Sequence, residues 1–184
     1  MEVKLLVKDK LISERLLLRT MTETDAPRLF QIWSSPDVTK FMNIEPFTEI
    51  KQAADMIDFL NGLARENKAV RYAVTDRQSG AIIGSCGFNE LDYEQRRAEI
   101  GYDLDRAFWG KEYAPEAIGC LLAYAFDELE MDRIDAKVEP ENVNSIKVLG
   151  KLRFTFAGTL RREEDAESAP SAPLLNLYTR SRED

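Results

Sequence analysis

The stretch DRAFWGKEYAPEA, residues 105–117, separates two segments of different pattern. The segment before it, RRAEIGYDLD, is typical of a strand that ends near Leu104. In the segment after it, from Tyr113 to Leu129, apolar residues recur at the i, i+3, i+4, i+7 spacing of a helix. Residues 105–117 are therefore predicted to turn the chain from a strand into a long apolar helix.

This turn has the properties of an anion site. The first N–H groups of a helix lack partners within it, and the helix dipole makes that end positive. Arg106 and Lys111 add positive charge on either side of Gly110. Neither the GxxxxGK[ST] nor the GxGxxG phosphate motif occurs here. The alternative is a plain strand-to-helix turn that uses Gly110 only for its backbone freedom.

The rest of the chain alternates between strand and helix patterns, with no internal repeat and no interdomain linker. Turn residues at 78–80 split an apolar alternating segment into a hairpin. The predicted strands are 14–21, the two arms of 70–91, 96–105, 133–140, 154–161 and 174–181. The predicted helices are 22–35, 49–66, 113–129 and 142–152, the last with Asn142 as N-cap.

Length and composition predict one soluble globular domain spanning residues 1–184. The chain is 44% hydrophobic and 32% charged, as in ordinary globular proteins. It contains no 18-residue apolar run and no signal-peptide pattern, so we expect a cytoplasmic protein without a membrane partner. The net charge of −8 argues against nucleic acid as a partner.

The chain contains no histidine, and this limits the chemistry. Nucleophile systems that depend on histidine and the usual zinc sites are excluded, and we expect no metal. Cys86 and Cys120 lack metal-ligand spacing and are predicted to be small buried side chains. Any acid or base must therefore be Glu, Asp, Lys, Tyr, Ser or Cys.

Five strings occur in the order of a known family over about residues 13–162: SERLLLRTMTETDAPRLF, IIGSCGF, RRAEIGYDLDRAFWGKEYAPEA, AYAFDELEMDRIDAKVEPENVNSIKVLGKLRF and AGTLR. On these the chain resembles the GCN5-related N-acetyltransferases (GNAT), RimJ/RimL-like branch. The resemblance implies an α+β fold in three α/β/α layers with about four helices. It also implies a mixed, mostly antiparallel sheet of six to seven strands, with a V-shaped splay between the fourth and fifth.

The resemblance further implies that Trp109 to Ala114 form a loop that grips the pyrophosphate of acetyl-CoA, the co-substrate. The family pattern has glycine where this chain has Glu112. An exposed carboxylate there would repel the pyrophosphate by about 1 kcal/mol unless it turns to solvent or to Lys111. The implied coenzyme contacts are Leu104, Arg106, Trp109, Gly110, Lys111, Glu112, Tyr113, Ala114, Asn142 and Ser145.

The catalytic groups are also inferred from the resemblance. A backbone N–H within residues 103–105 polarises the thioester carbonyl. Ser145 is implied to lie near the sulfur, where it can protonate or hydrogen-bond the departing thiolate. Many relatives outside this branch use a tyrosine seven positions after the asparagine, where this chain has Leu149. Two glutamates are candidate bases: Glu99, which faces either the cleft or solvent, and Glu164, which otherwise belongs to a solvated charge run; a water molecule is the third candidate.

We therefore expect an enzyme that transfers acetyl from acetyl-CoA directly to a primary amine. The resemblance favours a protein N-terminal α-amine, as in the ribosomal-protein acetyltransferases of this branch. One alternative acceptor is a small amine such as a polyamine or aminoglycoside. Another alternative is a CoA-binding module without turnover, suggested by Glu112, the absent tyrosine and Arg153, which stands where the family has glycine. The resemblance also allows a homodimer.

Overall fold

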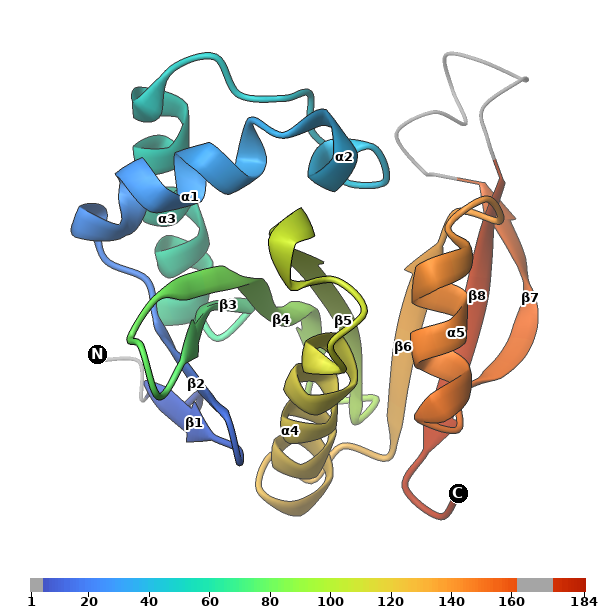
Figure 1. Cartoon of the computed structure of the whole chain (residues 1–184). Helices are drawn as coiled ribbons and strands as arrows, with labels where there is room; N and C mark the ends of the chain where they lie inside the picture. The colour runs from blue at the N-terminus through green and yellow to red at the C-terminus, as the bar shows by residue number, and fades with distance from the viewer. Residues whose placement is uncertain (1–4, 162–173) are drawn as a thin grey trace.

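The computed structural model describes residues 5–161 and 174–184, and within them eight strands form one sheet in the order β1-β2-β3-β4-β5-β6-β8-β7 (Figure 1). The strands are β1 Lys10–Ile12, β2 Leu16–Thr20, β3 Val70–Asp76, β4 Ile82–Asp92, β5 Arg97–Leu104, β6 Arg133–Val138, β7 Thr155–Arg161 and β8 Leu174–Ser181. The predicted mixed and mostly antiparallel sheet is confirmed, since only β5 and β6 pair in parallel.

The splay lies between β5 and β6, which are the predicted fourth and fifth strands. Their ladder begins at Arg97 and ends where Glu99 faces Asp135. Beyond that pair the strands separate, so the edge of β5 from residue 100 to 104 is not covered by β6 (Figure 1). A wedge between two strands exposes backbone hydrogen-bonding groups, because the sheet ladder no longer uses them.

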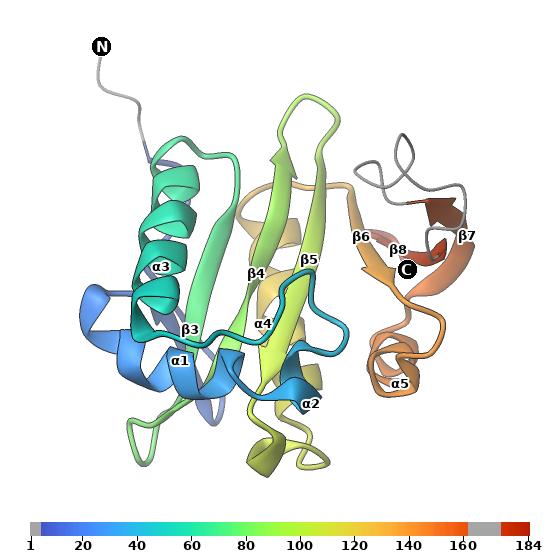
Figure 2. The ribbon, with the colours of Figure 1, turned by 90° about the horizontal axis from the view of Figure 1, so that it is seen from above.

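Five α-helices and two short 3₁₀ helices occur in the described residues. They are η1 Glu23–Asp25, α1 Ala26–Trp33, α2 Pro36–Thr39, α3 Ile50–Arg65, η2 Arg106–Phe108, α4 Tyr113–Asp127 and α5 Val143–Lys151. Figure 2 shows α1 and α3 together on one side of the sheet. None of the helices in residues 5–161 and 174–184 is long and apolar enough to cross a membrane.

The strands carry two apolar clusters, one on each face. In β3, Val70, Tyr72 and Val74 pack in the cluster that contains α4, whereas Ala73 packs in the cluster with α1 and α3. This alternation is the period of two that a strand covered on both faces requires. The central helix α4 buries apolar residues along most of its length, as its spacing predicted.

Two elements differ from the sequence prediction. β1, only three residues long, makes an eighth strand by pairing with β2. A three-residue segment is too short for apolar alternation to predict a strand. The single turn α2 lies in the segment expected to be a loop, and it begins with Pro36 after Ser35 as N-cap.

Candidate active site

Two clefts meet in the wedge between β5 and β6. The first, here called the α4 cleft, has a volume of about 730 Å³ and lies among the N-terminus of α4, α5 and α2. The second, the α3 cleft, has a volume of about 790 Å³ and runs from α3 over the sheet to β6, β7 and β8. The residues common to both are Phe41, Met42, Tyr102, Asp103, Asn142 and Ser145.

All the predicted coenzyme contacts except Lys111 line the α4 cleft. The ammonium group of Lys111 instead lies 5.6 Å from the centre of the Phe108 ring. The structure therefore does not bring this predicted cation into the cleft. Lys147 and Lys151, which the sequence reasoning missed, line it from α5. They share one face of a short helix with Asn144, and only the position of α5 beside the wedge reveals them.

The turn before α4 requires left-handed backbone at two positions. Gly110 has φ 72° and Glu112, the N-cap of α4, has φ 64°. A side chain at such a φ costs about 1 kcal/mol relative to glycine, which explains why a glycine is favoured at position 112. The Glu112 carboxylate lies 2.6 Å from the Lys151 ammonium on α5. The carboxylate therefore pairs with Lys151 and not with Lys111. This ion pair joins the N-terminus of α4 to α5 at the α4 cleft.

The same turn is tied to the start of β2. Glu116, in the first turn of α4, accepts hydrogen bonds from the Ser13 hydroxyl (2.6 Å), the Arg15 N–H (2.6 Å) and the Arg15 guanidinium (2.7 Å). Arg15 also donates to the Lys111 carbonyl at 3.0 Å. Burial opposes ionisation of Glu116, but the hydrogen bonds from Ser13 and Arg15 outweigh it and lower its pKa. Arg15 and Glu116 thus hold the turn in place.

The free edge of β5 presents a donor to the wedge. The N–H of Asp105 donates to the Ile83 carbonyl of β4 at 2.8 Å. Because successive residues of a strand point their N–H groups to opposite edges, the N–H of Leu104 points away from β4, toward the wedge. The Leu104 carbonyl accepts the indole N–H of Trp109 at 2.9 Å. Within the predicted range 103–105, Leu104 is thus the residue that can polarise a carbonyl in the cleft.

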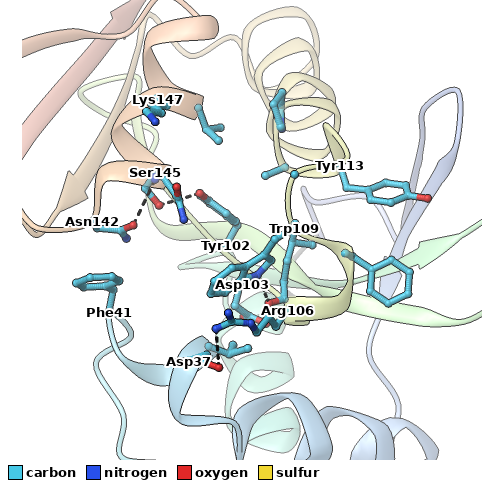
Figure 3. Close-up of a pocket in the computed structure, with 18 of the residues that line it drawn as sticks. Asp37, Phe41, Tyr102, Asp103, Arg106, Trp109, Tyr113, Asn142, Ser145 and Lys147 are labelled. Atoms are coloured by element: carbon cyan, nitrogen blue, oxygen red, sulfur yellow. Dashed lines mark hydrogen bonds and ion pairs between the residues drawn. The ribbon is translucent and has the colours of Figure 1, made fainter.

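Ser145 lies where the two clefts meet and is only 8% exposed (Figure 3). Its backbone N–H donates to the Asn142 side chain at 3.3 Å, which confirms Asn142 as the N-cap of α5. Its hydroxyl lies 2.7 Å from the phenol of Tyr102. Burial raises the Tyr102 pKa, although the hydrogen bond with Ser145 opposes the rise. Sequence reasoning missed Tyr102, because it lies on the same strand face as Ile100, two residues before it, and so looks like a core residue.

The floor of the α3 cleft is a ladder of charged and polar side chains. The Arg71 guanidinium lies 2.8 Å from the Asp103 carboxylate, which also accepts the Ser85 hydroxyl at 2.5 Å. Asn89 lies next to Arg71 and directly over Gly101. A Cβ at position 101 would come within 2.6 Å of the Asn89 amide, so glycine there leaves the space that the ladder occupies.

Glu99 extends this ladder to the start of the wedge. Its side chain is 15% exposed and its carboxylate lies 2.9 Å from the Lys137 ammonium of β6. The Asn89 amide donates to the same carboxylate at 3.3 Å. Of the two predicted orientations, Glu99 adopts the one that faces the cleft. The other predicted base, Glu164, lies outside the described residues.

The family model described as Acetyltransferase (GNAT) domain matches residues 15–155, which is most of the chain. The chain belongs to this family. It is 50% identical over 170 residues to the uncharacterized N-acetyltransferase p20 of Bacillus licheniformis, covering 92% of this chain and 93% of that protein. It is 24% identical over 146 residues to the spermidine N(1)-acetyltransferase of Escherichia coli, covering 79% and 76%. The protein is thus an N-acetyltransferase.

Solved GNAT structures share the fold. An acetyltransferase from Bacillus anthracis superposes with a TM-score of 0.81 at 23% identity, covering 95% of this chain and 99% of that one. The ribosomal L7/L12 α-N-protein acetyltransferase RimL, solved in complex with coenzyme A, superposes with a TM-score of 0.80 at 22% identity, covering 92% and 96%. The solved structures of this fold therefore include one with coenzyme A bound.

Proposed function

We propose that this GNAT protein transfers acetyl from acetyl-CoA directly to the α-amine at the N-terminus of a protein or peptide. One observation carries the proposal: the α4 cleft and the α3 cleft meet at Ser145 and Tyr102. One cleft presents cations and a helix N-terminus, and the other presents a shielded carboxylate, Glu99. A thioester entering from one side and an amine from the other would react where the clefts join.

The residues of the α4 cleft fit acetyl-CoA. The N–H groups at the start of α4 suit a pyrophosphate. Lys147 lines the cleft beside them, with Arg106 and Lys151, which form ion pairs with Asp37 and Glu112. The uncovered edge of β5 suits the amide groups of pantetheine, which can extend the broken ladder. The Leu104 N–H would then stabilise the negative charge that develops on the thioester oxygen.

The reaction requires the amine to be neutral when it attacks. Glu99 is the base we propose, either in direct contact with the amine or through one water molecule. An α-amine has a pKa of about 8 and a lysine amine one of about 10.4, so a single carboxylate deprotonates the α-amine more readily. Transfer then proceeds without a covalent enzyme intermediate, because the two substrates share one site.

The charge of the α3 cleft supports an acceptor with a single cationic group. Among the described residues that line it, three acidic side chains face three basic ones: Glu99, Asp103 and Glu139 against Arg71, Lys137 and Arg161. Asp103 is paired with Arg71 and Glu99 with Lys137, and the described charges of the cleft balance one another. A polyamine carries several ammonium groups and would need an excess of carboxylates.

A small polyamine is the second candidate acceptor, favoured by the likeness to a spermidine acetyltransferase and by the net charge of −8. The test incubates the protein with acetyl-CoA and a mixture of peptides with free N-termini, the same peptides blocked at the N-terminus, and polyamines. Mass spectrometry is expected to find acetyl on free peptide N-termini only. Acetylation of polyamines alone would establish the second candidate. Coenzyme binding without any acetylated product would contradict both candidate acceptors.

A further inference from the structure

The hydrogen bond between Tyr102 and Ser145 joins the two halves of the divided sheet. Tyr102 belongs to β5 and Ser145 to the first turn of α5, which packs beside β6. Their oxygens are 2.7 Å apart, and Figure 3 shows the two side chains pointing toward one another across the wedge. Both residues line both clefts. This contact therefore lies at the position where thioester and amine would meet.

The direction of this hydrogen bond follows from the chemistry of the two groups. A phenol is the stronger acid of the two and therefore the better donor, and burial of Tyr102 keeps it protonated by raising its pKa. The Ser145 oxygen then accepts, and no other group among the described residues hydrogen-bonds that hydroxyl. The proton of Ser145 is thus left to point into the cleft.

We propose that Tyr102 is a positioning residue that orients the Ser145 hydroxyl so that it donates to the sulfur of the departing coenzyme A thiolate. This inference rests on the proposed function. The amine nitrogen bonds to the acetyl carbonyl carbon, and the carbon–sulfur bond breaks with both electrons passing to sulfur. The amine proton passes to Glu99 or to water. The Ser145 hydroxyl holds the thiolate by a hydrogen bond until the thiolate takes a proton from solvent and leaves as coenzyme A.

The direct test is binding, and it needs no acceptor. Coenzyme A and desulfo-coenzyme A, in which hydrogen replaces the thiol, differ only at the sulfur. At an alkaline pH, where part of the coenzyme A thiol is ionised, calorimetry is expected to show coenzyme A binding about tenfold more tightly than the desulfo form. Tyr102→Phe and Ser145→Ala are each expected to remove most of this preference while leaving the affinity for the desulfo form unchanged.

The matched control is Tyr178→Phe. Tyr178 lies on β8 against Phe156 and outside both clefts, so this variant also lacks a phenol hydroxyl but leaves the site unchanged. The preference of the variant for coenzyme A over the desulfo form should equal that of the wild type. A thermal midpoint for Tyr102→Phe close to the wild-type value would exclude a general loss of packing, since the ring itself remains.

Kinetics supply the second readout. Once an acceptor amine has been identified, Tyr102→Phe is expected to lower kcat about tenfold and to leave the KM for acetyl-CoA unchanged. The double variant Tyr102→Phe/Ser145→Ala should be no slower than Ser145→Ala alone, because Tyr102 acts only through Ser145.

Two results would overturn the inference while leaving the proposed function intact. One is a wild-type protein that binds coenzyme A and desulfo-coenzyme A equally well. The other is a Tyr102→Phe variant that retains the wild-type preference. If the wild type binds neither ligand, the proposed function itself fails, and the role of Tyr102 fails with it.

Discussion

The two clefts that meet at Ser145 are built in different ways. The α4 cleft is lined mainly by two short runs of sequence, residues 102–115 and 142–151. The α3 cleft draws its lining from segments between residue 33 and residue 175, with most elements contributing one to four side chains. The first depends on local backbone geometry and the second on long-range pairing. A site of the first kind can be recognised from a motif, whereas a site of the second kind needs the packed structure.

The largest loss of stability is expected when the buried ion pair of Arg71 and Asp103, on the floor of the α3 cleft, is broken. The Asp103 side chain is 1% exposed, so Arg71→Met would leave its carboxylate buried with only Ser85 as partner. Loss of one member of such a pair costs about 3–5 kcal/mol. We expect urea denaturation to show a drop of that size in the free energy of unfolding.

The control for this prediction is the exposed pair of Lys51 and Asp55 on α3, where Lys51→Met should change stability by about 0.5 kcal/mol or less. The double variant Arg71→Met/Asp103→Leu should recover much of the loss, because it leaves no unpaired charge. A loss under about 1 kcal/mol in Arg71→Met would show that long-range pairing does not stabilise the α3 cleft.

The rate of catalysis is expected to depend on Glu99, the proposed general base at the end of the same polar ladder. Glu99→Gln should lower kcat about 100-fold, the usual contribution of a general base, with the KM for acetyl-CoA unchanged. Steady-state release of free thiol would measure it. Glu90→Gln, which removes a more exposed carboxylate of β4 outside both clefts, should leave kcat unchanged. Equal rates for Glu99→Gln and wild type would assign proton removal to another group or to water.

A smaller loss of stability is expected when Glu116, which holds the turn before α4 in place, is replaced. The pKa of Glu116 is lowered in the folded protein, so its stabilisation is complete above the unfolded pKa of about 4.3 and is lost as pH falls through the lower folded value. Glu116→Gln should cost about 1–2 kcal/mol at neutral pH. It should also weaken acetyl-CoA binding, because the turn is less firmly held.

Denaturation at a series of acidic pH values would check this linkage. The variant should lose less stability than the wild type on acidification below about pH 4.3, since it no longer has this carboxylate to protonate. Glu94→Gln, in the turn between β4 and β5, should follow the wild-type curve. Identical acid curves for Glu116→Gln and wild type would contradict the role of Glu116 as an anchor.

The smallest changes in stability and binding are expected at two residues whose backbone is left-handed. Glu112 and Arg153 both have φ 64° and both stand where the family pattern has glycine. Glycine at either position should stabilise the fold by about 1 kcal/mol, measured by thermal denaturation. Only Glu112→Gly should also tighten acetyl-CoA binding at low salt, because it removes a carboxylate from the α4 cleft and frees Lys151. Equal binding by both variants would show that Glu112 has no electrostatic effect on the coenzyme.

The sequence by itself determined the local features of this protein. The spacing of α4, the strand before it, the turn between them and the Asn142 cap were all predicted from residues close in the chain. These features depend on hydrogen bonds and side-chain periodicities that extend over a few residues.

The tertiary structure alone decided which side chains meet. Tyr102 and Ser145 are 43 residues apart in sequence, Arg71 and Asp103 are 32 apart, and Lys151 reaches Glu112 across 39. Glu99 faces the cleft because β5 and β6 pair in register up to that residue and then separate. Such contacts depend on strand register and on where helices pack. A one-residue shift in register would turn the strand side chains among them, Arg71, Glu99, Tyr102 and Asp103, to the opposite face of the sheet.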